Sequence, residues 1–362
     1  MSDDPAPLDI EKLMRDLQES GRQQRLIEAE RPTGQFAGDV LWQSVDLARK
    51  VLDASRDVVF LGDGLDPENE WGLRFVHGST AEQDQDWLQG TLVFEIPTDE
   101  LGEPIHYLTH PLVDPVRCTL DFVQRFVRAA MDHLESLGHL VRDDVGFRAP
   151  AVLSRAALEA CAAACYLTAS EASPAERLRR LWNLQCEQLT EEAARAGPTD
   201  GVEARAHRDA ILEAAEVVGF KVTRVKPSER YRSPKVLADD GQAHSTTSAM
   251  IEALLTADLG RSMWQGLSDV AHSRSSGLMF LDDISRERQI TAMRTESIAL
   301  HAMPALLAFA GLGDHLEEYL GWDQLSWKES FDPVLQVWHA ASGGADQAIR
   351  HRLGLPPPPR GA

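Results

Sequence analysis

The most apolar stretch of the chain lies near its middle, where residues 151–169 read AVLSRAALEACAAACYLTA. Alanine and leucine fill many of its positions, and its only charged residues are Arg155 and Glu159. Apolar residues on nearly every side of a helix are typical of a helix that is buried all round. The pattern therefore predicts a central helix just after Pro150, with the stretch 261–280 as its partner.

Other segments repeat apolar residues at the three- and four-residue spacing of a helix. Proline fits the first helical turn and glycine suits the position after the last, so these residues help to place the ends. Ser173 and Pro174 predict one start, Gly138 predicts an end, and 311–313 predict another after a kink near Pro304. The predicted helices are 9–30, 39–54, 114–138, 174–196, 202–218, 246–255, 288–310, 314–320 and 333–341.

A second kind of pattern occurs between residues 58 and 109. Short β-like runs lie at 58–61, 91–96 and 105–109. Turn residues at 99–104 separate the last two runs, which predicts a small hairpin. The expected fold class is therefore mainly α, a helical bundle with a small β-containing N-terminal region.

Three regions follow from this pattern. Residues 1–112 form an acidic region of helix and β-hairpin, and residues 113–342 form the helical bundle. Residues 343–362 form a tail that ends in PPPPRGA, and we expect its last residues to be disordered.

The chain is strongly acidic, with a formal net charge of -21 over 362 residues. Nucleic acid phosphates and anionic membranes both attract clustered Lys and Arg, so this balance argues against general affinity for either. The N-terminus lacks the features of a signal peptide, and two charges interrupt the most apolar stretch, which disfavours a membrane span. We expect a soluble cytoplasmic protein that does not act at a membrane.

The sequence offers no complete motif for a metal or a cofactor. Cys161 and Cys165 lie one helical turn apart, but no second pair of Cys or His follows at zinc-site spacing. Glu103 and His106 have metal-like spacing without a matching pair. Signatures of P-loops, Rossmann folds, zincins and serine hydrolases do not occur. We therefore predict no metal, no cofactor and four free thiols.

Two polar pairs have the spacing of one helical turn: Arg155 with Glu159, and Ser268 with His272. If the central helix and its partner meet on these faces, the four side chains form a polar cluster. In one interpretation the cluster is catalytic: His272 exchanges protons, Glu159 orients it, Arg155 binds an anion and Ser268 contributes to binding. In the other, a buried network fixes the register of the helices.

Residues 219–236 are the one basic island, with six Lys or Arg against one Glu. Alternating residues and two prolines predict an extended or hairpin excursion. The candidates for binding RNA or a nucleotide there are Arg224, Arg230, Tyr231 and Arg232, because arginines contact phosphates and an aromatic ring stacks on a base. The alternatives are a solvated loop or an interface with the acidic N-terminal segment.

Three phrases within residues 150–330 carry a family resemblance: LSRAALEACAAACYL, GLSDVAHSRSSGL and, after a late apolar helix, GWDQLSW. They resemble a group of uncharacterised helical proteins from high-GC bacteria that is related to the HEPN-like superfamily of nucleotide-binding and RNase bundles. The richness in Arg and Ala agrees with a high-GC bacterial source. The resemblance implies an all-α bundle that is often dimeric, and metal-independent cleavage of RNA.

The chain departs from this family at its catalytic motif. Active HEPN RNases resemble one another in an Arg-x4-6-His motif, and His272 has no arginine at that spacing before it. Arg128–His133 and Arg294–His301 do match the motif, but chance alone accounts for such matches in a chain this rich in arginine.

The sequence thus leaves several functions open, and whether the protein is an enzyme stays undecided. The first is a homo-oligomeric bundle protein that binds a protein or a small ligand. The second is a metal-independent endoribonuclease of HEPN type in stress or phage defence, using His272, Glu159 and Arg155. A third has residues 1–110 as a partner-binding module. An RNase would need His272 in a cleft that solvent can reach.

Overall fold

The structure is a computed structural model, and its described residues comprise the main helices, four short strands and some of the turns. These residues are 34–54, 56–58, 71–73, 75–91, 112, 115–143, 149–224, 233–237, 246–255, 257–272, 291–322 and 325–341. The predicted helix 9–30, the predicted strand 105–109 and the tail 343–362 lie outside them.

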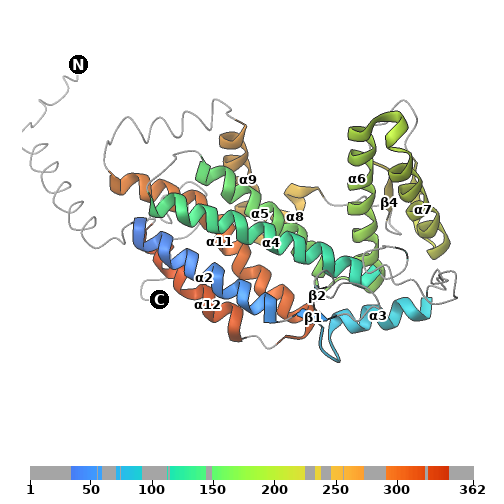
Figure 1. The fold of residues 1–362 in the computed structure, drawn as a ribbon, viewed down its shortest axis with the longest axis horizontal. Helices are drawn as coiled ribbons and strands as arrows, with labels where there is room; N and C mark the ends of the chain where they lie inside the picture. The colour runs from blue at the N-terminus through green and yellow to red at the C-terminus, as the bar shows by residue number, and fades with distance from the viewer. Residues whose placement is uncertain are drawn as a thin grey trace, which may run out of the picture.

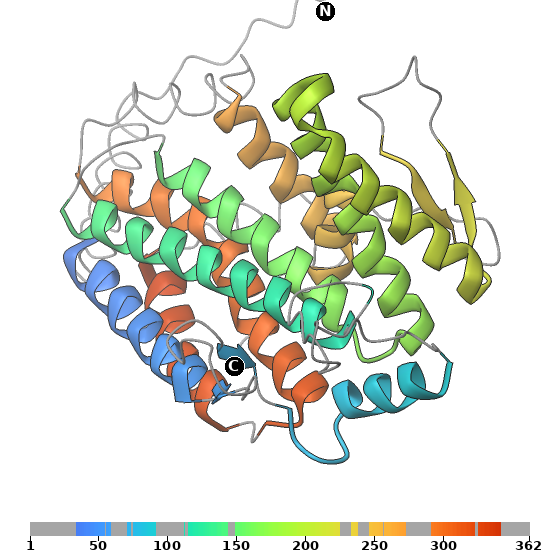
Figure 2. The same ribbon diagram turned by 45° about the vertical axis from the view of Figure 1, so that its right-hand side comes forward.

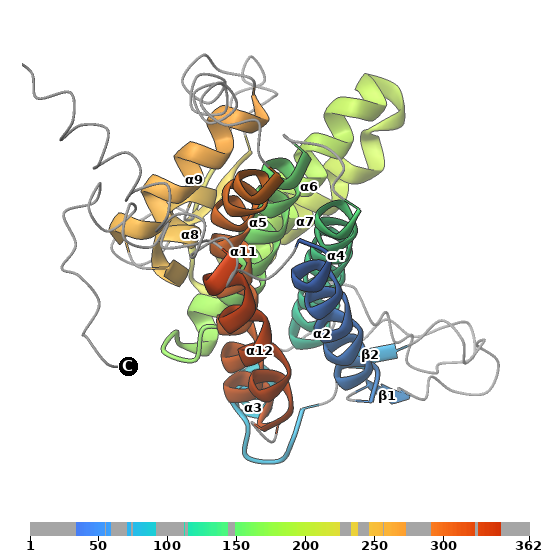
Figure 3. The same cartoon turned by 90° about the vertical axis from the view of Figure 1, so that its left-hand side faces the viewer.

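Five of the described helices close into a ring around the main core, as Figures 1 and 3 show. In the order α2, α4, α5, α11 and α12, each helix packs against the next, and α12 packs against α2. In α4, for example, buried residues recur every three or four positions from Val116 to Val141. The bounds are Gly34–Ala54 for α2, Pro115–Arg142 for α4, Ala149–Thr168 for α5, Thr291–Leu320 for α11 and Leu325–Ala341 for α12.

Helix α5 is the central helix that the apolar pattern predicts. It packs on α4 and α11 in the ring and also contacts the helices outside it. The Ser154 hydroxyl is fully buried and donates a hydrogen bond to the His301 carbonyl of α11. By length and composition α5 could cross a membrane, but 67% of its most apolar 18-residue segment is buried inside the bundle. Such burial is typical of the core helix of a soluble protein.

Two short helices cover α5 where the sequence predicts its partner. α8 (Thr247–Leu255) and α9 (Ala257–Ala271) pack against each other and both pack on α5. The predicted partner stretch 261–280 therefore begins inside α9, and residues 273–280 lie outside the described residues. The contact of α9 with α5 is the one that forms the candidate site.

A helical hairpin stands beside the ring and is most visible in Figure 2. It consists of α6 (Pro174–Asp200) and α7 (Val202–Val218), followed by strands β3 (Lys221–Thr223) and β4 (Lys235–Leu237). The two strands pair antiparallel, with Val222 opposite Val236. The described ends of the basic island, residues 221–223 and 235–237, therefore pair as in a hairpin, which agrees with the predicted excursion.

The ends of these two helices follow local signals in the sequence. Ser173 caps α6, because its hydroxyl accepts a hydrogen bond from the Glu176 amide at 3.2 Å, and Pro174 follows in the first turn. Gly197 breaks the helical path with φ of 87°, and Gly219 ends α7 with φ of 101°. These predicted boundaries are confirmed.

Gly138 does not end α4, contrary to the prediction. The helix continues to Arg142, and Gly138 lies where α2 and α4 cross. A Cβ atom at Gly38 on α2 would lie 2.5 Å from the Gly138 carbonyl oxygen. The glycines are thus needed for close helix packing and not for a turn.

The prediction that residues 311–313 end a helix is also wrong, since α11 runs unbroken to Leu320. Leu312, Leu316 and Leu320 are fully buried along one face of the continued helix. Burial of a leucine side chain contributes ~2 kcal/mol, more than the ~1 kcal/mol that a helical glycine costs relative to alanine. The predicted separate helix 314–320 is the last part of α11.

Strands β1 (Arg56–Val58) and β2 (Trp71–Leu73) pair antiparallel in the N-terminal region. The next element is helix α3 (Thr80–Thr91), which the sequence analysis missed. Its buried positions include Ala81, Asp84 and Leu88. Because one of these buried positions holds a charged residue, the inward face does not show the apolar spacing that predicts a helix.

The described residues are mainly α-helical and form a bundle, which confirms the helical part of the expected fold class. Helices α2 and α3, which precede residue 113, both pack on helices of the 113–342 region.

Candidate functional site

The candidate site is built on α5, where Arg155 and Glu159 lie one turn apart on the face toward α9. Their side chains form an ion pair, with Arg155 Nε donating to Glu159 Oε1 at 2.8 Å. The Arg155 side chain is 18% exposed and that of Glu159 is 33% exposed. The pair therefore lies at the edge of the core, where solvent still reaches it.

Trp264 of α9 completes the inner part of this cluster. Its indole Nε1 donates to the same Glu159 oxygen at 3.1 Å. The Arg155 guanidinium lies 5.6 Å from the Trp264 ring centroid, which is the geometry of a cation–π contact. Glu159 and Trp264 together hold the guanidinium in place.

His272 immediately follows α9 and forms the outer part of the cluster. Its Nε2 lies 2.9 Å from Nη1 of Arg155, and the imidazole is exposed. Arginine can only donate, so Nε2 accepts this hydrogen bond and the proton of the neutral ring sits on Nδ1. Nδ1 therefore carries a proton that it can donate in a hydrogen bond to a ligand.

The structure brings three of the four predicted cluster residues together and leaves the fourth aside. Ser268 is buried on α9, and its hydroxyl makes no hydrogen bond to Arg155, Glu159 or His272. Its backbone carbonyl accepts the His272 amide at 2.9 Å, as helical geometry requires. Trp264 takes the place expected for Ser268. The sequence contained a signal for the position of Trp264, since Trp264, Ser268 and His272 are spaced four residues apart and so lie on one face of the helix.

The basic island supplies one described candidate residue. Arg224 is exposed beyond β3 and pairs with Glu216 of α7, Nη2 to Oε2 at 3.0 Å. Arg230, Tyr231 and Arg232 lie outside the described residues. Of these candidates the structure therefore describes only Arg224, in an exposed ion pair with Glu216, and the phosphate site remains a prediction.

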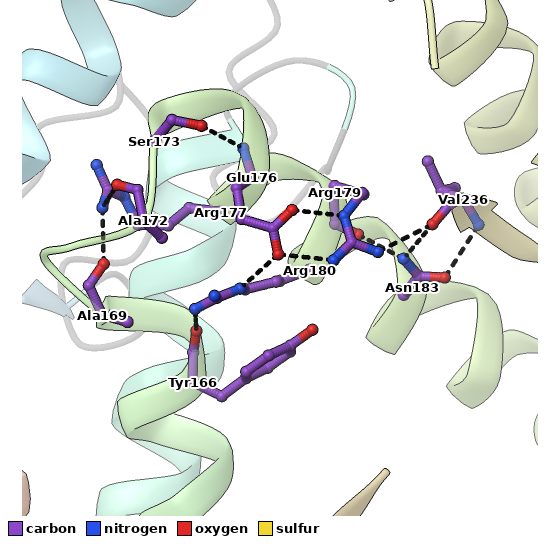
Figure 4. Close-up of polar contacts among 10 residues, drawn as sticks. All are labelled: Tyr166, Ala169, Ala172, Ser173, Glu176, Arg177, Arg179, Arg180, Asn183 and Val236. Carbon is purple, nitrogen blue, oxygen red and sulfur yellow. Dashed lines mark hydrogen bonds and ion pairs between the residues drawn. The ribbon is translucent and has the colours of Figure 1, made fainter. Parts of the chain in front are cut away.

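A second polar network, which the sequence analysis missed, lies at the start of α6 (Figure 4). Glu176 accepts hydrogen bonds from Arg179 at 2.6 Å and from Arg180 at 2.9 Å. Burial by itself would raise the pKa of Glu176, but these two hydrogen bonds and charges lower it below the usual value. The carboxylate is therefore held in its ionised form.

Two side chains of α6 bind the β-hairpin to this network (Figure 4). Asn183 donates to the Val236 carbonyl at 2.9 Å and accepts the Val236 amide at 3.0 Å, as a neighbouring strand would. Arg179 Nη1 donates to the same carbonyl at 3.2 Å. These bonds provide partners for the Val236 backbone amide and carbonyl at the outer edge of β4, and they hold the β-hairpin against α6.

Arg177 and Arg180 bind the C-terminal end of α5. Arg180 donates to the Tyr166 carbonyl at 2.7 Å, and Arg177 donates to the carbonyls of Ala169 and Ala172 (Figure 4). Positive charge at the C-terminal end of a helix is stabilising. The sequence signal was the dense run of charges just after a capping serine and a proline.

Arg177 also forms a buried ion pair across the molecule. Its Nε and Nη2 donate to the two oxygens of Asp84 on α3, at 2.7 and 2.6 Å. Tyr319 of α11 donates to Asp84 Oδ2 at 3.0 Å, and burial raises the pKa of this phenol well above its usual value. The network joins three helices and is closed to solvent, so it holds the fold together.

The cysteines take no part in either network as nucleophiles. The four thiols are free and buried. Burial raises the pKa of Cys186 to about 12 and that of Cys161 still further, so both stay protonated at neutral pH. Among the described residues, no group of three or more His, Cys, Asp or Glu is placed to hold a metal ion.

The fold and the site define a mainly α-helical bundle protein with a solvent-facing polar cluster between α5 and α9. Comparisons with protein-family models, with curated proteins and with solved structures found no match.

Proposed function

We propose that the protein is a binding protein and that the Arg155 cluster, made of Arg155, Glu159, Trp264 and His272, is its ligand site. The observation that carries this proposal is the exposed His272 in contact with an arginine that is four-fifths buried and held by a carboxylate and an indole. A network needed only for helix register gains nothing from an exposed imidazole at its outer end. A rigid cation with an exposed donor beside it suits recognition.

The chemistry of the cluster fits a small ligand that combines an anionic group with an apolar part. The guanidinium of Arg155 and the Nδ1 proton of His272 are donors suited to a carboxylate or a phosphate. Val152 lies one turn before Arg155 on the same face of α5 and is 44% exposed. It offers an apolar contact next to the charged group, as small-molecule sites commonly do.

Calorimetric titration of the full chain with benzoate, inorganic phosphate and adenosine monophosphate tests this proposal. We expect at least one of the three to bind, and His272→Ala and Arg155→Lys each to weaken binding by about tenfold, because each removes a directed hydrogen bond. His77→Ala is the matched control, since His77 is also exposed and also has a charged partner. Binding that is equal in all four proteins would contradict the proposal, as would no binding in any.

A second candidate function is the metal-independent endoribonuclease of HEPN type, and the solvent-exposed position of His272 favours it. A general base needs a free lone pair, however, and in this arrangement Nε2 accepts from Arg155 while Nδ1 carries the proton. Cleavage would require the imidazole to leave Arg155 when RNA binds. Incubation of a labelled single-stranded RNA with wild type and His272→Ala decides the point: cleavage by the wild type alone supports the nuclease.

We also propose a HEPN-like relationship, a bacterial source, a cytoplasmic location and a homo-oligomeric state. The mainly helical bundle and the three sequence phrases support the first of these. Sedimentation velocity at micromolar concentration tests the oligomer, and a single monomeric species would contradict it.

A further inference from the structure

The ion pair in the Arg155 cluster uses only part of each charged group. Glu159 Oε1 accepts two hydrogen bonds, from Arg155 Nε at 2.8 Å and from Trp264 Nε1 at 3.1 Å. His272 accepts from Nη1 of Arg155. Among the residues that the structure describes, none is hydrogen-bonded to Arg155 Nη2 or to Glu159 Oε2. The ion pair therefore keeps one donor nitrogen and one acceptor oxygen open.

Solvent reaches both of these open atoms. The side chains of Arg155 and Glu159 are partly exposed at the edge of the core, and neither Nη2 nor Oε2 is a buried atom without a partner. A charged group that lacks a partner is costly in the core, but at the edge water can hydrate it. A ligand that arrives from outside the bundle can therefore contact both atoms.

The balance of charge in the cluster limits which ligands suit it. Arg155 and Glu159 carry opposite charges, and His272 accepts from Arg155 as a neutral ring. A ligand with an anionic group alone would place that group beside the open oxygen of Glu159, which repels it. A ligand that also carries a cationic donor satisfies both atoms, because hydrogen bonds between charged groups are the strong ones.

We infer that the ligand is a zwitterion, namely an α-amino acid with an apolar side chain, an assignment that rests on the proposed function. Its carboxylate accepts from Arg155 Nη2 and from His272 Nδ1, and its ammonium group donates to Glu159 Oε2. Both charged groups of an α-amino acid are bonded to one carbon atom, and Nη2 and Oε2 belong to two side chains in direct contact. Adjacent charges in the site thus match adjacent charges in the ligand.

Val152 supplies the contact for the apolar side chain of the ligand. It is exposed and lies one turn before Arg155 on the same face of α5, about 4.5 Å away along the helix axis. Glu159 lies one turn beyond Arg155, so apolar, cationic and anionic contacts follow one another along the helix. The side chain of valine forms no hydrogen bonds, so this position favours a hydrocarbon over a polar side chain of the ligand.

Calorimetric titration of the full chain with L-leucine and with isocaproate tests the inference. The two compounds share a carboxylate and a hydrocarbon chain, and they differ only in the ammonium group that we assign to Glu159. We expect leucine to bind about tenfold more tightly, because it makes one more hydrogen bond between charged groups. The two charges of ε-aminocaproate lie far apart, so this compound should bind about as weakly as isocaproate.

Glu159→Gln is the informative variant, because it removes the charge and still accepts from Arg155 through its amide oxygen. It should bind leucine about tenfold more weakly than the wild type does and isocaproate no more weakly. Glu191→Gln is the matched control, since Glu191 pairs with Arg195 one turn away on the exposed face of α6. It should leave both affinities unchanged. The comparison of the two compounds on the wild type does not depend on how the variant folds.

Equal affinity of the wild type for leucine and isocaproate would overturn the inference and leave the proposed function standing, because an anionic apolar ligand would still bind. Equal weakening of both compounds by Glu159→Gln would also overturn it, since the carboxylate would then only hold the guanidinium. If neither compound binds, the inference fails, and the titrations with benzoate, phosphate and adenosine monophosphate decide whether the proposed function fails with it.

Discussion

Arginine side chains lie in two different environments in this molecule, which differ in their exposure to solvent. Arg177 and Asp84 form an ion pair in which each side chain is 5% exposed, with no room for a ligand. Arg155 pairs with Glu159 at the edge of the core and reaches the exposed His272. The same residue type thus stabilises the fold in one place and, in the proposed function, offers a binding group in another.

We predict a large loss of stability for Asp84→Asn. The substitution keeps the shape of the side chain but leaves the buried guanidinium of Arg177 without its counter-charge, at a cost of about 3 kcal/mol in the free energy of unfolding. Urea denaturation followed by circular dichroism measures it. Glu252→Gln is the control, because its partner Arg261 is 62% exposed, and it should change stability far less. Equal losses would contradict the assignment.

We predict that Glu176→Gln flattens the dependence of stability on pH. The pKa of Glu176 is lower in the folded chain than in the unfolded one, so its contribution is present above the unfolded pKa of about 4.3 and is lost as the pH falls through the folded value. As the pH falls from about 7 to about 3, through the folded pKa, the urea midpoint of the wild type should therefore fall further than that of the variant. Glu191→Gln, exposed on the same helix, should keep the wild-type slope.

At the scale of elements, helix boundaries depended on whether a glycine acts locally or in packing. Gly197 and Gly219 adopt positive φ and interrupt or end a helix, so chain-local reasoning placed them correctly. Gly138 is helical and allows α2 to approach α4, and Gly311 lies within the unbroken α11. A sequence shows that a glycine is present, but only its neighbours in space reveal which of these purposes it serves.

We predict that Gly38→Ala destabilises the bundle, although alanine is a better helix former. The new Cβ would lie 2.5 Å from the Gly138 carbonyl oxygen and 2.8 Å from Arg142 Cβ, so α2 and α4 must move apart, at about 1–3 kcal/mol. Gly138→Ala is the comparison variant, because its Cβ would lie 3.2 Å from the Gly38 carbonyl oxygen, a smaller overlap, and it should cost less stability than Gly38→Ala. Thermal unfolding compares the two, and the reverse order would refute the crossing geometry.

At the scale of the whole molecule, the ring of five helices closes where α12 returns to α2. Trp338 is fully buried there, and its indole donates to the Ala37 carbonyl at 3.0 Å. This contact joins residues that are 301 positions apart in sequence. The α6–α7 hairpin instead packs on α5, α4 and α3 through α6. The closure of the ring and the attachment of the hairpin therefore depend on different contacts.

We predict that Trp338→Phe loosens the ring and leaves the hairpin intact. Loss of the indole hydrogen bond and of packing volume should cost about 1–3 kcal/mol. Hydrogen–deuterium exchange should then accelerate in α2 and α12 and stay unchanged in α6 and α7. Val236→Ala, on the strand bound by Asn183, should produce the opposite pattern. Uniform acceleration in both variants would show that the two parts open together.

Local signals in the sequence were sufficient to place several helices. Apolar spacing identified α4, α5, α6 and α7, and the Ser173–Pro174 start of α6 followed from the hydrogen bonds of a helix end. The same spacing placed Arg155, Glu159 and His272 on faces that can meet. These features depend on residues a turn or two apart, and such short-range rules can be read from one chain.

Which side chains meet on these faces became clear from the packing of the helices. It showed that Trp264 replaces Ser268 in the cluster and that His272 remains exposed. It also showed that Asp84 is a buried residue that pairs with Arg177 of α6. A charge on a helix looks the same in sequence whether it meets water or a distant partner, because burial and pairing are set by contacts between segments far apart in the chain.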